Sequence, residues 1–169
     1  TDEASVAVKV ISVCDTNPSL SKKLSQDIGS EMTKNYLDLL KDSRINAILI
    51  ATPPFLHKSI AVDSAAAGKH VFTEKPMATS LLDCDHMIQA AQSNDVQLGV
   101  GLVCRFHAIH SKVRELVHSG QYGRPISMKV HRTGGPWPGE PGHWRMKREE
   151  CGGFLMEVNA HEIDFIRWT

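Results

Sequence analysis

Apolar and polar positions alternate in blocks along the first hundred residues. Short apolar runs rich in β-branched side chains predict strands at 6–13, 45–51, 70–73 and 96–103. Between and after them, apolar residues at helical spacing predict helices at 19–28, 36–41, 57–67, 79–92 and 109–118. The run at 45–51 is nearly continuous, which is typical of a parallel strand buried on both faces.

This order of strand and helix indicates βαβ units and therefore an α/β fold with a doubly wound parallel sheet. The pattern changes after Gly123. Residues 125–131 alternate like a strand of an open-faced sheet, a Gly/Pro loop follows at 134–142, and helical spacing returns at 153–168. We therefore expect one domain at 1–104 and the start of a second, open-sheet α/β domain at 105–169.

Charge and cysteine content narrow the class of partner. Nineteen basic and nineteen acidic residues cancel, so nothing attracts the chain over long range to nucleic acid or an anionic membrane. No apolar run approaches the ~20 residues needed to cross a bilayer. The four cysteines have neither CxxC nor zinc-type spacing, which favours a reducing, cytoplasmic compartment: Cys14, Cys84, Cys104 and Cys151. A small-molecule or protein partner is expected.

A glycine-rich phosphate loop is missing from the sequence. The only G-x-G is Gly99-Val100-Gly101, which has no third glycine and no helix behind it. A dinucleotide site needs such a loop at a helix N-terminus to hold the pyrophosphate. If the chain has that fold, the strand at 6–13 is the second strand. The first strand, its loop and its helix would precede Thr1, so we expect a chain truncated at both ends.

Two residues at predicted strand ends are candidates for ligand contact, because ligands bind at the carboxyl ends of doubly wound strands. Asp15 could accept hydrogen bonds from the two hydroxyls of an adenosine ribose, and its charge would repel a 2′-phosphate. It could equally be a turn-forming Asp before Asn17-Pro18. Lys75 could donate to a substrate oxygen or form a surface ion pair.

The last segment carries three chemically active side chains. If 153–168 is one helix, Glu157, His161 and Asp164 share one face. The carboxylate could then orient the imidazole, which accepts protons near neutral pH. An ordinary Glu–His pair on a helix explains the same spacing. A metal site is not expected, since no second His stands at the HExxH position and no Cys cluster accompanies the three.

Three segments together resemble the glucose–fructose oxidoreductase/inositol dehydrogenase (Gfo/Idh/MocA) family: ATPPFLH at 51–57, AGKHVFTEKP at 67–76 and GGFLMEVNAHEID at 152–164. Weaker similarity extends over nearly the whole chain, in the same order. The resemblance implies a Rossmann domain followed by an open-sheet α/β domain. It also implies NAD or NADP as cofactor, with NAD favoured by Asp15, and hydride transfer at a secondary alcohol of a sugar or polyol.

The resemblance also implies roles for single residues. Lys75 matches the lysine that touches both cofactor and substrate hydroxyl, and the bond before Pro76 is expected to be cis. His161 matches the catalytic base. Glu157 stands where the family usually has Asp, so its longer side chain is expected to orient substrate or His161. Val103 replaces the family's Asn. The implied cofactor-binding residues are Asp15, Thr52, Pro53, His57, Glu74, Lys75, Pro76 and Arg105.

Two alternatives to this function stay open. One is a non-catalytic member of the family that senses a nucleotide or a sugar, which the departures at Glu157 and Val103 allow. The other is a fragment without activity of its own, because the chain lacks the main pyrophosphate site. We expect the parent protein to be a homo-oligomer and this chain alone to bind the cofactor poorly. The dehydrogenase hypothesis depends on Lys75 and His161 lying at one site.

Overall fold

The computed structural model describes residues 8–134 and 140–169. Its strands are β1 (Ser12–Cys14), β2 (Glu31–Thr33), β3 (Ala47–Ile50), β4 (His70–Thr73) and β5 (Leu98–Val100). The α-helices are α1 (Pro18–Ile28), α2 (Tyr36–Lys41), α3 (His57–Ala66), α4 (Leu81–Ser93), α5 (Ala108–His118), α6 (Arg148–Cys151), α7 (Phe154–Glu157) and α8 (Ala160–Trp168). Short 3₁₀ turns stand between them: η1 (Pro54–Leu56), η2 (Val103–Phe106) and η3 (Trp144–Met146).

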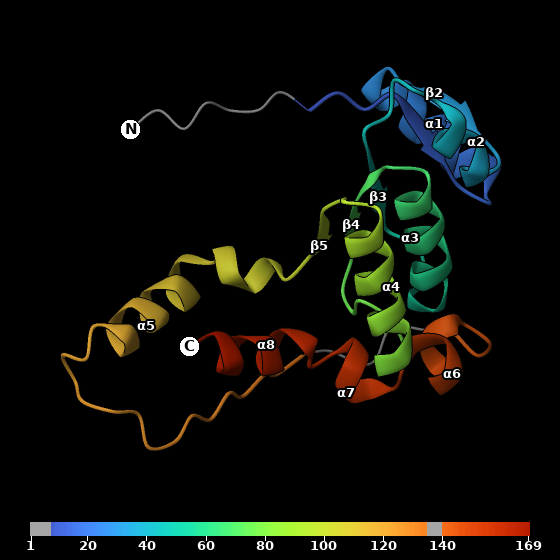
Figure 1. Ribbon diagram of the computed structural model, residues 1–169. Coiled ribbons are helices and arrows are strands. Elements are labelled where there is room, and N and C mark those ends of the chain that lie inside the picture. Colours follow the sequence, from blue (N-terminus) through green and yellow to red (C-terminus); the bar gives the residue numbers. More distant parts are fainter. Residues whose placement is uncertain (1–7, 135–139) are drawn as a thin grey trace.

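All strand pairings are parallel, which confirms the predicted α/β class. β1 pairs with β2, and β3, β4 and β5 pair in that order. Within the described residues these two groups are separate sheets (Figure 1). In the doubly wound order 3-2-1-4-5-6, one strand stands between the positions that β1 and β3 occupy here. The break therefore agrees with β1 being a second strand rather than a first.

Local capping explains where the predicted helices begin and end. The Asn17 side chain accepts hydrogen bonds at the start of α1, and Gly29 ends that helix with a φ of 68°. Ser80 accepts from the Asp83 N–H at the start of α4. The five helices predicted in residues 19–118 are confirmed with small shifts of their ends. β2 was not predicted, because its exposed sequence Glu-Met-Thr has no apolar pattern.

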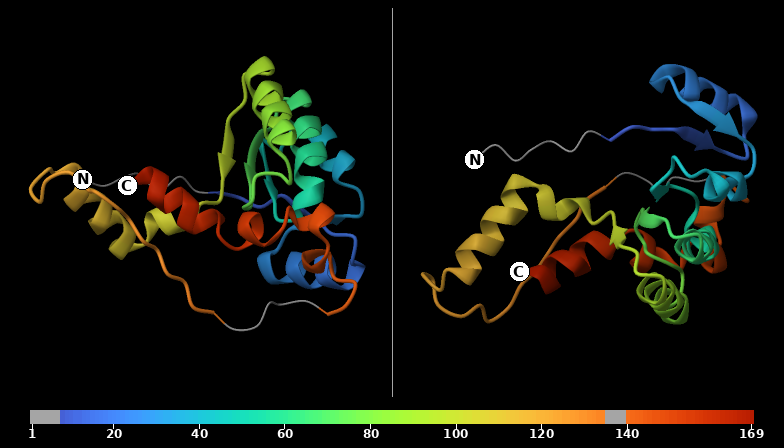
Figure 2. Two further views of the ribbon diagram at one scale, coloured as in Figure 1. Left: turned by 90° about the horizontal axis from the view of Figure 1, so that it is seen from below. Right: turned by 45° about the horizontal axis from the view of Figure 1, so that its top comes forward.

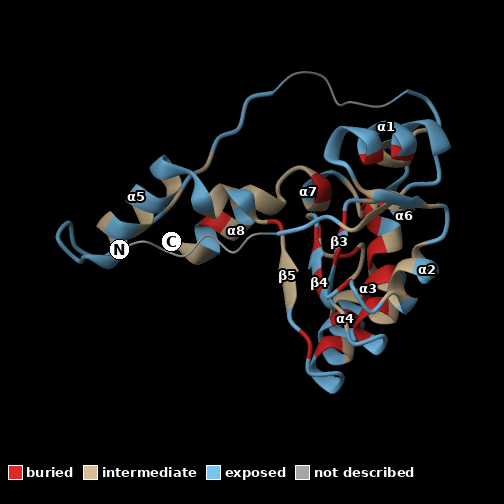
Figure 3. Cartoon of the chain, turned by 90° about the horizontal axis from the view of Figure 1, so that it is seen from above, coloured by how far each residue is buried: buried red, intermediate tan, exposed pale blue. Residues whose placement is uncertain are grey.

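The hydrophobic core lies between one face of the three-stranded sheet and helices α3 and α4 (Figure 3). Ile48 and Ile50 of β3 and Val71 of β4 point into it. On the opposite face Leu49 is 71% exposed and Phe72 45%. The prediction that residues 45–51 are buried on both faces is therefore wrong. Both helices cover the same face, and among the described residues nothing covers the other.

The C-terminal part is more open. After β5 the chain forms η2 and α5, turns at 119–122, and continues without helix or strand over 123–134 (Figure 2). The strand predicted at 125–131 is not formed in the described part of the chain, because these residues have no neighbouring strand to pair with. Residues 135–139 of the predicted Gly/Pro loop, and 6–7 of the first predicted strand, lie outside the described residues. None of the described helices is long and apolar enough to cross a membrane.

Candidate functional site

His57 ties together the turns that follow β3 and β4. It is the first residue of α3 and is completely buried. Its Nδ1 lies 2.9 Å from the Pro76 carbonyl oxygen and its Nε2 2.8 Å from that of Thr52. His57 was predicted to line a cofactor, and its complete burial bears on that prediction. The ring lies inside the protein, where it contacts the two turns and has no exposed surface for a ligand.

Lys75 leads from the end of β4 to the C-terminal helices. The Lys75–Pro76 bond is cis, as the resemblance implied. The Lys75 N–H donates to the Glu74 carboxylate at 3.1 Å. The side chain donates from Nζ to the main-chain oxygen of Glu157, 82 residues away, at 2.6 Å. This bond joins the strand end to the turn between α7 and α8.

The predicted helix at 153–168 is interrupted at this bond. α7 ends at Glu157 and α8 begins at Ala160, so the prediction of one continuous helix is wrong. In a continuous helix the N–H of His161 would donate to the Glu157 oxygen. That oxygen instead accepts from the Lys75 ammonium. A cation at a helix C-terminus also interacts favourably with the helix dipole.

Arg132 binds the next main-chain oxygen along the chain, that of Val158. Its Nη1 donates to the Val158 oxygen at 3.3 Å and to the Glu162 carboxylate at 3.1 Å. In an unbroken helix the Val158 oxygen would accept from the Glu162 N–H. Two basic side chains, distant in sequence, thus bind the carbonyls that the break releases.

The Glu157 carboxylate is buried between two cations. The residue is 5% exposed, and its Oε1 lies 3.4 Å from Lys75 Nζ and 3.4 Å from Arg145 Nε. Such pairing compensates for the loss of water around a buried charge. Oε2 is buried and has no hydrogen-bond partner among the described residues. Among the described residues no hydrogen bond joins Glu157 to His161, so the expectation that Glu157 orients substrate or His161 stays a prediction. Sequence reasoning missed Arg145, although it belongs to the GHWR segment at 142–145.

His161 is half-buried at the start of α8, and its Nδ1 is buried without a hydrogen-bond partner in the described residues. Burial lowers the pKa of its imidazole first, and the charge of Lys75 lowers it further. Arg132 also lowers this pKa, whereas Glu162 and Glu74 raise it. The ring is therefore neutral at pH 7 and able to accept a proton. The structure brings Lys75, Glu157 and His161 together.

Asp164 does not share a site with them. Its carboxylate accepts two hydrogen bonds from Arg105, at 2.8 Å from Nε and 2.5 Å from Nη2. The third residue predicted on the His161 face is thus paired with a predicted cofactor-binding residue. In the described ranges no three His, Cys, Asp or Glu side chains gather as metal ligands would.

The remaining predicted cofactor residues lie at or near strand ends. Asp15 follows β1, is exposed, and accepts from the Asn17 N–H at 2.7 Å, which is the turn geometry of the alternative reading. Glu74 lies over Gly101, where an added Cβ would meet its carboxylate at 3.3 Å. Thr52 and Pro53 are half-buried in the turn after β3, and Pro76 is buried. An exposed acid and two turns at carboxyl strand ends lie where a doubly wound fold binds a dinucleotide.

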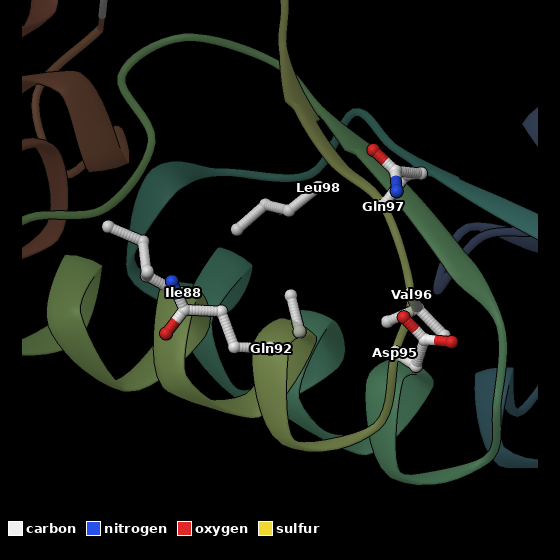
Figure 4. A pocket seen from close by; sticks show the side chains of 7 residues that line it. Ile88, Gln92, Asp95, Val96, Gln97 and Leu98 are labelled. Carbon is white, nitrogen blue, oxygen red and sulfur yellow. The ribbon is translucent and has the colours of Figure 1, made fainter.

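A hollow between α4 and β5 lies elsewhere. Figure 4 shows Ile88 and Gln92 of the helix facing Leu98 of the strand, with Val96 beside them. The hollow opens where α4 ends and β5 begins, at the amino end of the strand. Lys75 follows the carboxyl end of β4, so this hollow is not part of the candidate site.

Comparison with known proteins gives two family matches. Residues 2–102 match the model described as "Oxidoreductase family, NAD-binding Rossmann fold", and residues 110–169 match the "GFO/IDH/MocA C-terminal domain". Among curated relatives, 1,5-anhydro-D-fructose reductase of Ensifer adhaerens is 33% identical, covering 84% of this chain and 42% of the relative. Myo-inositol 2-dehydrogenase of Thermotoga maritima is 27% identical, covering 92% and 46%.

A solved structure has the same fold. The WlbA dehydrogenase of Bordetella pertussis, in complex with NADH and UDP-GlcNAcA, is 28% identical with a TM-score of 0.80. The alignment covers 95% of this chain and 47% of that one. The chain thus spans less than half the length of the relatives that it matches.

Proposed function

Because this chain belongs to the oxidoreductase family with an NAD-binding Rossmann fold, we propose that the whole protein transfers a hydride between a nicotinamide cofactor and a secondary alcohol. The substrate is a sugar, a polyol or a related small molecule. Support comes from relatives named as a sugar reductase and an inositol dehydrogenase. The observation that carries the proposal is the meeting of Lys75, from the end of β4, with the turn that precedes His161.

Lys75, His161 and Glu157 have different roles in the proposed reaction. The Lys75 ammonium holds the substrate hydroxyl oxygen and stabilises the negative charge that develops on it. His161, neutral at pH 7, removes the hydroxyl proton. The hydride leaves the carbon that carries this hydroxyl, so that the alcohol becomes a carbonyl. Oε2 of Glu157, which lacks a partner among the described residues, accepts a hydrogen bond from a further substrate hydroxyl.

The cofactor, when bound, supplies the acceptor for the hydride. We assign its adenosine ribose to Asp15, which favours NAD over NADP because the carboxylate repels a 2′-phosphate. Thr52 and Pro53 line the site from the turn after β3, and Glu74, Lys75 and Pro76 from the turn after β4. His57 supports both turns from beneath.

The proposal includes a cytoplasmic, homo-oligomeric protein that binds neither nucleic acid nor membrane. A formal net charge of zero and four free cysteines support this assignment. The boundary between the proposed domains stays at 104/105, next to Arg105.

A substrate screen tests the function. The whole protein is mixed with NAD or NADP and a panel of sugars and polyols, and the absorbance of the reduced cofactor is followed. We expect turnover of at least one secondary alcohol, with NAD preferred. Tight binding of reduced cofactor without any turnover across the panel would contradict the proposal and favour the alternative, a non-catalytic sensor. Exchanging Asp15 for Ser should weaken the preference for NAD.

A further inference from the structure

The pair formed by Arg105 and Asp164 holds α8 against η2. The two hydrogen bonds run side by side from one guanidinium to one carboxylate, which constrains orientation as well as distance. The Asp164 side chain is 12% exposed and that of Arg105 41%. η2 follows directly on β5, so the contact connects the C-terminal helix to the end of the sheet.

Further contacts hold the same helix from the same side. Trp168, at the end of α8, lies under the guanidinium of Arg114 from α5, 4.8 Å from ring centre to Cζ. Arg114 Nε also donates to the Trp168 oxygen at 3.0 Å. Phe165 meets His110 of α5 edge-on, with ring centres 4.3 Å apart. Three residues in the last five of α8 are therefore anchored on η2 and α5.

His161 depends on this anchoring. It stands three residues before Asp164, on the same nine-residue helix. Its Nδ1 has no hydrogen-bond partner in the described part of the chain. On its other side the helix is interrupted at Val158 and Asn159. The location of the imidazole is thus set by the placement of α8 rather than by a bond of its own.

We propose that Arg105 is a positioning residue, which holds α8 through Asp164 and so keeps His161 beside Lys75. The inference rests on the proposed function, in which His161 is the base. It gives the Arg105 guanidinium a task other than the cofactor contact implied by family resemblance. The two tasks make different predictions for Asp164, which pairs with Arg105 and is not assigned to the cofactor.

Kinetics of the whole protein separate the two tasks. We expect Asp164→Asn and Arg105→Met each to lower kcat about tenfold, because a displaced base loses near-attack geometry. The double variant should lose no more than either single one, and the KM of the cofactor should stay unchanged in all three. Arg105→Lys keeps the charge and one bond, so it should recover part of kcat. Arg44→Met is the matched control: Arg44 makes a similar fork to exposed Glu31 on the surface.

A second measurement does not depend on turnover. The His161 imidazole is titrated by NMR in the cofactor-free protein, with its signal assigned from His161→Gln. Loosening α8 in Asp164→Asn or Arg105→Met should expose the ring and raise its lowered pKa toward the ordinary value. Its charged neighbours Lys75, Arg132, Glu162 and Glu74 are unchanged in these variants. Arg44→Met should titrate like the wild type.

The outcomes are decisive in either direction. An unchanged His161 titration in both variants overturns the inference, as does a cofactor KM raised by Arg105→Met but not by Asp164→Asn. If Asp164→Asn does not fold, Arg105→Met is used in its place. A wild-type protein without turnover counts against the proposed function, while the titration still decides whether Arg105 positions His161.

Discussion

The turns after β3 and β4 and the helix pair α7–α8 each place one histidine near the candidate site, and the two differ in their bonding. His57 is completely buried, and both ring nitrogens lie within hydrogen-bond distance of main-chain oxygens. His161 is half-buried, and its Nδ1 has no partner in the described residues. Buried polar groups are normally paired, so an unpaired one calls for an explanation. The ring of the first histidine is thus bound within the protein, whereas the second leaves a buried nitrogen unpaired among the described residues.

The largest difference between the two regions is expected in turnover. His161→Ala in the whole protein should lower kcat by ~10²–10⁴, the usual contribution of a general base, while cofactor binding changes little. Steady-state kinetics and a cofactor fluorescence titration measure both quantities. His118→Gln, at the exposed end of α5, serves as control. If His161→Ala turns over normally, the comparison between the histidines is wrong.

In the free energy of unfolding, substitution of His57 should have the larger effect and substitution of His161 the smaller. His57→Ala removes the ring N–H that donates to one of the two main-chain oxygens and opens a cavity, at a cost of about 3 kcal/mol in the free energy of unfolding. His161→Ala should cost much less, because no hydrogen bond of its side chain is found among the described residues. Urea unfolding followed by circular dichroism measures both, with exposed His86→Ala as the control. Equal losses for His57 and His161 would remove the distinction.

The pH dependence of stability sharpens the same contrast. The pKa of His161 is lowered in the folded protein, so the unfolded chain binds its proton first as the pH falls. Stability from this group is complete above the ordinary value of 6.5, falls as the pH drops below it, and levels off below the folded pKa. The stability difference between wild type and His161→Gln, followed from pH 8 downward, should shift against the wild type. A constant difference would show that the ring is not desolvated.

The smallest effect is expected away from both histidines. The Tyr36 hydroxyl of α2 donates to the Asp63 carboxylate of α3 at 2.6 Å, and this bond raises the pKa of the phenol to about 12. Tyr36→Phe should cost about 1 kcal/mol. The loss should shrink as the pH rises from 10 toward 12, where the bond no longer stabilises the folded state. Exposed Tyr122→Phe should have no effect in the same urea titration.

Local signals made one part of the molecule predictable. Asn17 and Gly29 bound α1, Ser80 starts α4, and the strand at 70–73 is found where its apolar run lies. These signals act over a few residues, so periodicity and capping suffice to read them. The strand expected at 125–131 is not formed because a strand also needs a neighbouring strand to pair with. Its own residue pattern is local and cannot supply that neighbour.

The sequence alone determined the order of elements up to residue 118 apart from β2, the parallel α/β class, and which side chains are candidates for chemistry, because periodicity, capping and residue type are local properties. Only the tertiary structure decided how those side chains are used. It buried His57 between two turns, turned Glu157 toward Lys75 and Arg145, and paired Asp164 with Arg105. These contacts join residues that are separated along the chain, and periodicity and capping do not specify them.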